Sequence, residues 1–146
     1  LRLQIGNGVD ILHLATHGVY NYTDPLESSI YLTQKNKAYA LTAEHIFKYP
    51  LAANKVILSA CETGLGKAIA GDDLLGLTRS FFLGGANSVL GSLWAIEDEG
   101  TLVFMEAFHK FAKTEETSRA WFMAKNHTQR LGYPPSVYAA FIYYGI

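Results

Sequence analysis

Cysteine is nearly absent from this sequence, and so are several features that would assign it to a specialised class of protein. Cys61 is the single cysteine among 146 residues, so the chain has no internal disulfide. The sequence also lacks an amino-terminal signal in which charged residues precede an apolar run. Both absences predict a reducing, cytoplasmic compartment, which suits a free reactive thiol.

Neither sign of charge dominates, and long hydrophobic runs are missing. The 12 Lys and Arg residues and 13 Asp and Glu residues give a net charge of −1, so there is no electrostatic basis for binding nucleic acid or an anionic membrane. The apolar stretches are much shorter than the ~20 residues that span a bilayer. Without internal repeats or low-complexity segments, residues 1–146 are expected to form one domain with a sizeable core. Because the sequence starts at Leu1 rather than Met, we expect a fragment of a longer polypeptide.

Short apolar runs alternate with segments of helical periodicity along the chain. Strands are expected at Val9–Ala15, Ser29–Thr33, Val56–Ala60, Asn87–Trp94 and Tyr138–Tyr144, and a loop at Gly18–Pro25. Helices are expected at Leu41–Tyr49 with Thr42 as N-cap, at Leu74–Phe82 ending at Gly84-Gly85, at Thr101–Ala112 and at Ser118–Leu131. This alternation favours an α/β fold with a mostly parallel sheet covered on both faces.

Two chemically reactive side chains directly follow two of these strands. His17 and Gly18 come after the first strand, and Cys61 comes after the strand at Val56–Ala60. Sites in parallel sheets collect beyond the carboxyl ends of the strands, and sequential strands are often neighbours. If these two strands are adjacent, His17 can activate the Cys61 thiol as a general base, and the Gly18 N–H can face a developing oxyanion.

Each of these residues also has an ordinary structural interpretation. Free cysteine is more often a small buried residue than a nucleophile, and His17 by itself is as easily a residue that caps a turn. The position of Cys61 favours a catalytic role. It stands at a strand-to-loop junction before Gly64 and Gly66, which let a substrate backbone approach.

A metal site is not supported by the spacing of the histidines. His13 and His17 lie four residues apart, but their segment is predicted to be a strand, and no H-E-x-x-H motif or further ligand is near. We expect His13 to be satisfied within the sheet. The other histidines, which fall in predicted helices without partners, are His45, His109 and His127.

Four blocks, in order along nearly the whole chain, resemble the CHAT family of caspase-like and separase-like peptidase domains, which commonly occur beside tetratricopeptide repeats. The blocks are His-Leu-Ala-Thr-His17-Gly, Leu-Ser-Ala-Cys61-Glu-Thr-Gly, Gly-Gly-Ala-Asn-Ser-Val-Leu-Gly-Ser-Leu-Trp94 and Ala-Ala-Phe-Ile-Tyr-Tyr-Gly145. The resemblance implies the caspase–haemoglobinase fold, a three-layer α/β/α arrangement. It also implies that His17 and Cys61 form a catalytic dyad, with the N–H groups of Gly18 and Cys61 as the oxyanion hole.

The sequence departs from patterns of this family and of its caspase relatives in ways that affect the expected fold and specificity. Family members have additional strands before the histidine strand, so the chain resembles a carboxyl-terminal portion of the full domain, with an apolar sheet edge left exposed. Tyr138 stands where tryptophan is usual, and the caspase signature Gln-Ala-Cys-x-Gly is absent, so aspartate specificity does not carry over. By resemblance to separases, Asp98 is the candidate for selecting a basic substrate side chain; its alternative role is simply to begin a helix.

These features together predict a cysteine endopeptidase that cleaves a protein substrate by acyl transfer and needs no metal or organic cofactor. The expected partners are tetratricopeptide repeats or other regulatory domains of the full-length chain, and neither nucleic acid nor a membrane. One alternative is a catalytically silent scaffold or protein-interaction module. Another is a small-molecule hydrolase, which would have an enclosed pocket.

Overall fold

The computed structural model describes residues 8–21, 23–34, 36–49, 52–59, 61–62 and 75–145. The strands are β1 (Val9–Leu14), β2 (His17–Val19), β3 (Ser29–Gln34), β4 (Lys37–Thr42), β5 (Ala53–Leu58), β6 (Cys61–Glu62), β7 (Ser88–Ser92) and β8 (Phe141–Gly145). The helices are α1 (Ala43–Lys48), α2 (Leu75–Leu83), α3 (Asp98–Phe111), α4 (Thr117–Arg130) and α5 (Pro135–Tyr138), with a 3-10 turn η1 (Pro25–Glu27).

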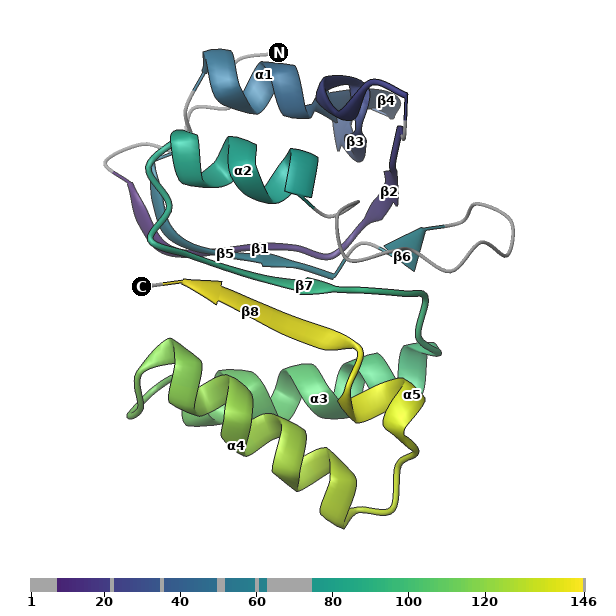
Figure 1. Cartoon of the computed structure of the whole chain (residues 1–146), viewed down its shortest axis with the longest axis vertical. Coiled ribbons are helices and arrows are strands. Elements are labelled where there is room, and N and C mark those ends of the chain that lie inside the picture. The colour runs from purple at the N-terminus through teal and green to yellow at the C-terminus, as the bar shows by residue number, and fades with distance from the viewer. Residues whose placement is uncertain are drawn as a thin grey trace.

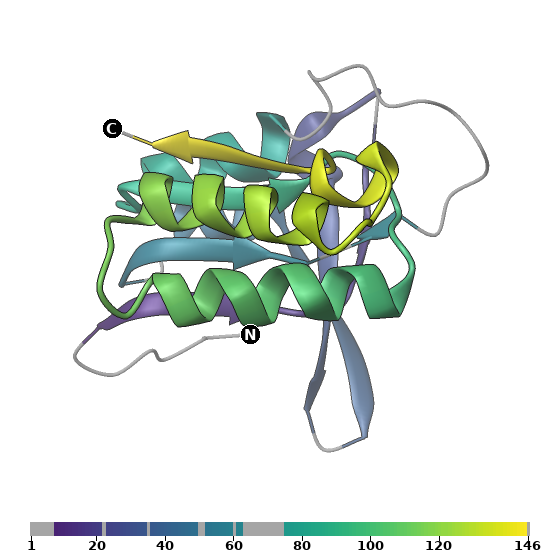
Figure 2. The ribbon, with the colours of Figure 1, turned by 90° about the horizontal axis from the view of Figure 1, so that it is seen from below.

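The main sheet lies between two layers of helices (Figure 1). Its strand order is β1-β5-β7-β8, in which β1, β5 and β7 are mutually parallel and β8 is antiparallel to β7. Helices α1 and α2 cover one face, and α3, α4 and α5 cover the other (Figures 1 and 2). The expected three-layer α/β/α architecture with a mostly parallel sheet is therefore confirmed.

The central strands are buried on both faces because their alternate side chains enter two separate cores. Val56 and Leu58 of β5 pack in the core beneath α1 and α2, together with Ile46 and Phe81 of those helices. Ile57, the residue between them, packs instead in the core beneath α3 and α4. This is why β5 carries consecutive apolar residues at Val56–Leu58 and β7 carries them at Val89 and Leu90.

A second sheet extends from the carboxyl ends of the main strands. Its order is β4-β3-β2-β6, in which β3 is antiparallel to both β2 and β4, and β2 is parallel to β6. Strands β3 and β4 form a hairpin that projects away from the helical layers (Figure 2). The short strand β2 follows β1 directly, and β6 follows β5, so the two sheets share their chain path at these two points.

The helix ends follow the predicted local chemistry. The Thr42 side chain accepts a hydrogen bond from the His45 N–H at the start of α1, as the expected N-cap. Helix α2 ends before Gly85, whose φ of 98° places it in the left-handed region. There the Gly85 and Ala86 N–H groups donate to the carbonyls of Phe82 and Phe81, which satisfies the end of the helix.

Three local expectations were wrong. His17–Val19 forms strand β2 rather than a turn and loop, because it pairs with strands on both sides. Leu41 and Thr42 belong to β4, which was not foreseen because its residues outside this end are exposed and lack a clear apolar pattern. The last strand begins at Phe141 rather than Tyr138, which ends the short helix α5.

The core beneath α3 and α4 predicts a large difference between two phenylalanines. Phe104 is fully buried and stacks on Phe141 with ring centroids 4.1 Å apart, whereas Phe122 on α4 is 56% exposed. Replacing Phe104 by Ala should lower the free energy of unfolding by about 3–5 kcal/mol. The same change at Phe122 should alter it by about 0.5 kcal/mol or less. Urea denaturation of the two variants measures both effects, and equal losses would contradict this assignment of the core.

Candidate functional site

The strand register brings the positions of His17 and Cys61 together. In β1 and β5 each residue pairs with the one 44 positions later, as Leu14 does with Leu58. The same offset reappears in β2 and β6, where His17 pairs with Cys61 and Gly18 with Glu62. Paired residues on neighbouring strands are separated by about one strand spacing, ~4.8 Å. The 44-residue spacing in the sequence is thus the register of the two strands.

Strand β2, which carries His17, is exposed at its first residue and buried at its second. The His17 side chain is exposed, while Gly18 is buried between two neighbouring strands, opposite Ile30 on one side and Glu62 on the other. For Cys61 the structure describes the backbone, which lies in β6 at the outer edge of the second sheet. Residues 63–74, including Gly64 and Gly66, lie outside the described residues.

Hydrogen bonds tie down the two short junctions between the main sheet and the second sheet. On the histidine side, the Thr16 hydroxyl donates to the Tyr31 carbonyl and so ties the β1–β2 junction to β3. On the cysteine side, the Ser59 N–H donates to the Leu14 carbonyl at 3.1 Å, which extends the β1–β5 pairing by one residue. Both junctions are therefore fixed by hydrogen bonds where the regular ladder is interrupted.

His13 links β1, the β5–β6 junction and helix α3. Its Nε2 lies 3.0 Å from the Ser59 hydroxyl oxygen, and its Nδ1 lies 3.1 Å from His109 Nε2. The prediction that His13 is satisfied within the sheet is confirmed. The prediction that His109 lacks a partner is wrong, because α3 packs across the sheet and carries His109 onto the ring of His13, with centroids 5.1 Å apart. His45 and His127 also have partners, the Thr42 hydroxyl and the Phe111 ring respectively.

Burial favours the neutral forms of both histidines of this pair. It lowers the pKa of His13 below its ordinary value of 6.5, and the nearby His109 lowers it further through charge repulsion. Burial also lowers the pKa of His109. When both rings are neutral, one donates and the other accepts in the hydrogen bond between them.

Asp98 is exposed and is the first residue of α3, which begins beyond the carboxyl end of β7. A cavity of about 440 Å³ lies beside this helix start, and its lining includes Glu97 and Glu99 but not Asp98. Glu99 accepts a hydrogen bond from the Tyr133 hydroxyl at 2.9 Å, and this bond raises the pKa of Tyr133. This cavity therefore has an acidic border, with Asp98 outside the cavity itself.

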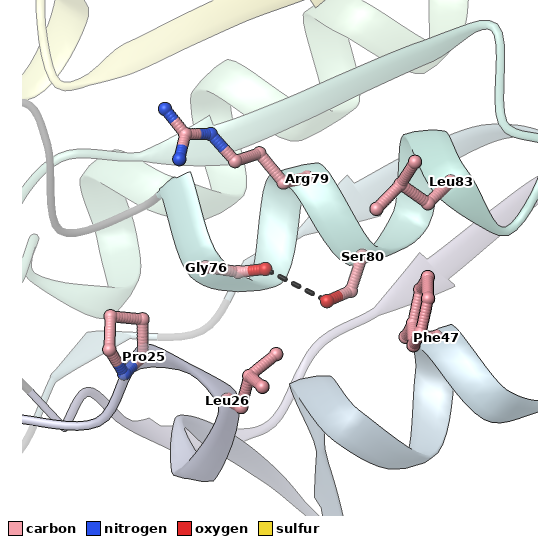
Figure 3. Close-up of a pocket in the computed structure, with 7 residues that line it drawn as sticks. All are labelled: Pro25, Leu26, Phe47, Gly76, Arg79, Ser80 and Leu83. Carbon is pink, nitrogen blue, oxygen red and sulfur yellow. Dashed lines mark hydrogen bonds between the residues drawn. The ribbon is translucent and has the colours of Figure 1, made fainter.

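A separate apolar groove of about 560 Å³ lies between η1, α1 and α2 (Figure 3), and none of its lining residues belongs to the two junctions. Leu26, Phe47 and Leu83 line it and remain 49%, 51% and 68% exposed. Arg79 is the cationic side chain of its lining. Helix α2 comes close to η1 here because Gly76 has no side chain, since a Cβ atom would lie 2.7 Å from the Pro25 carbonyl oxygen. This groove could not be foreseen from the sequence, because its walls come from three separate segments.

The described residues contain neither a metal-binding cluster nor a membrane-spanning helix. No group of three or more His, Cys, Asp or Glu side chains in that part of the chain is arranged to hold a metal ion. None of the helices described there combines the length and the apolar character that crossing a bilayer requires.

The residues missed by sequence reasoning are Ser59 and His109. Ser59 had a recognisable signal, because it lies 46 positions after His13, two beyond the partner that the 44-residue register assigns. Residues two apart on a strand share a face, so this spacing places Ser59 diagonally across from His13. His109 had no such signal, because its contact depends on how α3 crosses the sheet.

The histidine pair predicts acid sensitivity. The unfolded chain binds more protons than the folded chain once the pH falls below the ordinary histidine pKa of 6.5, so stability is lost below that value. His109→Gln should therefore show a smaller fall in Tm than the wild type between about pH 7.5 and about pH 5.5. Replacing the exposed His127 by Gln provides the control. An identical fall in Tm for His109→Gln and wild type would contradict this account.

Two comparisons with known proteins agree with this geometry. A family model described as the CHAT domain matches residues 1–145. Over 69 residues the chain is 35% identical to the mouse (Mus musculus) protein named tetratricopeptide repeat protein 28; the match covers 47% of this chain but 3% of that protein. Because the family match extends over nearly the full sequence, the chain belongs to the CHAT domain family.

Proposed function

We propose that this CHAT domain is a cysteine endopeptidase in which His17 and Cys61 form the catalytic dyad. The observation that carries the proposal is the pairing of His17 with Cys61 across two parallel strands, in the same 44-residue register as the main sheet. A family related to caspase-like peptidases supports the reaction class. The exposure of His17 supports access to a peptide.

The proposed reaction is acyl transfer through a thioester. His17 takes the proton of the Cys61 thiol, and the thiolate attacks the carbonyl carbon of the scissile peptide. The tetrahedral oxyanion receives hydrogen bonds from the N–H groups of Gly18 and Cys61. The imidazolium returns its proton to the leaving amine, and water activated by the same imidazole then releases the acid product and the free thiol.

Regulation by another part of a longer protein fits this proposal. The mouse relative is named for tetratricopeptide repeats, and the matched region is a small part of it. We infer that tetratricopeptide repeats or similar domains control the peptidase in a cytoplasmic setting. The apolar groove with Leu26, Phe47 and Leu83 exposed is a described surface suited to such a contact.

A peptide with a thiol-reactive warhead tests the dyad. It should label the full-length, activated protein at Cys61, and Cys61→Ala should abolish both labelling and peptide cleavage. His17→Ala should slow cleavage by about 10²- to 10⁴-fold, the usual contribution of a general base. His127→Ala, a change at an exposed histidine on α4, should leave the rate unchanged. Intact mass and the rate of peptide hydrolysis are measured.

Full cleavage by Cys61→Ala would exclude the dyad. Folded, full-length protein that is neither labelled nor active under any activating condition would instead favour the scaffold alternative.

Asp98 is proposed to select a basic side chain of the substrate, because it is an exposed acid at the start of α3, beyond the carboxyl end of β7. Asp98→Lys should reduce kcat/KM for basic peptides by roughly 10-fold or more, since it replaces attraction by repulsion. Glu106→Lys makes the same charge change at an exposed position further along α3 and should have little effect. Cleavage of a peptide library measures the preference, and an unchanged preference for basic residues would remove Asp98 from this role.

A further inference from the structure

Three polar side chains form a continuous hydrogen-bonded chain that ends next to the segment carrying Cys61. The Ser59 hydroxyl contacts His13 Nε2 at 3.0 Å, and His13 Nδ1 contacts His109 Nε2 at 3.1 Å. Ser59 directly follows β5, His13 lies near the end of β1, and His109 lies in the last turn of α3. Ser59 is two residues before Cys61, and His13 is four residues before His17.

This hydrogen-bonded chain connects the segments that carry His17 and Cys61, at the point where the regular pairing of their strands is interrupted. The ladder of β1 and β5 ends at Leu14 and Leu58 and resumes at His17 and Cys61. Within this gap Ser59 makes two bonds to β1, one from its N–H to the Leu14 carbonyl and one between its hydroxyl and His13. A residue held through both backbone and side chain has little freedom to shift along its neighbour.

Helix α3 fixes the far end of the chain. The His109 ring lies 5.1 Å from that of His13, and the edge of Phe108 packs against it at a centroid distance of 5.4 Å. Phe108 itself is fully buried beneath the helix. Ser59 is therefore held in place both by the neighbouring strand and, through His13 and His109, by helix α3.

The hydrogen bonds have a consistent proton arrangement in either direction. If His109 donates to His13 Nδ1, then His13 Nε2–H donates to the Ser59 oxygen; if His13 Nδ1–H donates to His109, the Ser59 hydroxyl donates to His13 Nε2. In both arrangements each ring nitrogen in the chain has a matched partner. The chain is thus complete with both rings neutral.

We infer that Ser59, His13 and His109 are positioning residues that hold the cysteine segment in register with His17. This inference rests on the proposed dyad. None of the three acts on a substrate; they set how closely the thiol and the imidazole meet. Since an ~1 Å misplacement of reacting groups can cost about 100-fold in rate, a loose junction would impair the reaction even in a folded domain.

The reactivity of Cys61 toward iodoacetamide tests the inference without a known substrate. A neighbouring imidazole lowers the pKa of a thiol below the ordinary ~8.5, so the pH midpoint of alkylation reports how the dyad is held. In the full-length protein, alkylation of the peptide containing Cys61 is followed by mass spectrometry as a function of pH. Ser59→Ala should raise the midpoint and slow alkylation at neutral pH by on the order of tenfold.

Matched variants separate positioning from general stability. Ser59→Thr keeps a hydroxyl and should restore the wild-type midpoint. His109→Leu breaks the chain at its far end and should shift the midpoint in the same direction as Ser59→Ala. Thr128→Val removes a buried hydroxyl that bonds the Ala124 carbonyl within α4, and should leave the midpoint unchanged whatever it does to Tm.

The outcomes for the dyad and for the chain are distinguishable. If His17→Ala raises the midpoint but Ser59→Ala and His109→Leu match the wild type, the positioning role is wrong and the dyad stands. If the wild-type midpoint is already that of a free thiol and His17→Ala does not change it, the dyad proposal is wrong, and the positioning role is wrong with it. Should Ser59→Ala not fold, His109→Leu and Ser59→Thr still decide between these results.

Discussion

The arrangement of this domain depends on the parallel pairing of β1 with β5 at a fixed offset of 44 residues. In a sheet with two buried faces, a slip of one residue would turn every side chain of a strand to the opposite core. Val56 and Leu58 would then face the α3 side, and Ile57 would face the α1 side, against the packing of both layers. The two cores therefore fix the register, and the register fixes which residues meet beyond the strand ends.

This constraint explains why a thiol and an imidazole separated by 44 residues occupy paired positions. The short strands β2 and β6, of three and two residues, are too short to specify their own alignment. They inherit it from the long strands that precede them, across junctions of two residues each. The site is thus held by apolar packing of the strands that precede it, which leaves the strand ends free to carry exposed side chains such as His17.

The sequence was informative wherever a single segment decides the structure. Apolar runs marked β1, β5 and β7, and local caps marked the start of α1 at Thr42 and the end of α2 before Gly85. It was less informative where structure depends on a neighbour. Strand β2 exists because β3 and β6 lie beside it, and nothing in His17–Val19 alone distinguishes a short paired strand from a turn. Strand β4 pairs along its length with β3, yet four of its six residues are exposed.

The same distinction separates the predicted site residues from those that were missed. His17 and Cys61 follow recognisable strands, so their positions could be inferred from the chain order and the usual location of sites in parallel sheets. The role of Ser59 becomes visible only when the register is known, and that of His109 only when α3 is placed across the sheet. A half-buried polar chain between strand and helix would be costly if any member lacked a partner. By maintaining such a chain beside the Cys61 segment, the fold ties the geometry of that segment to the position of α3.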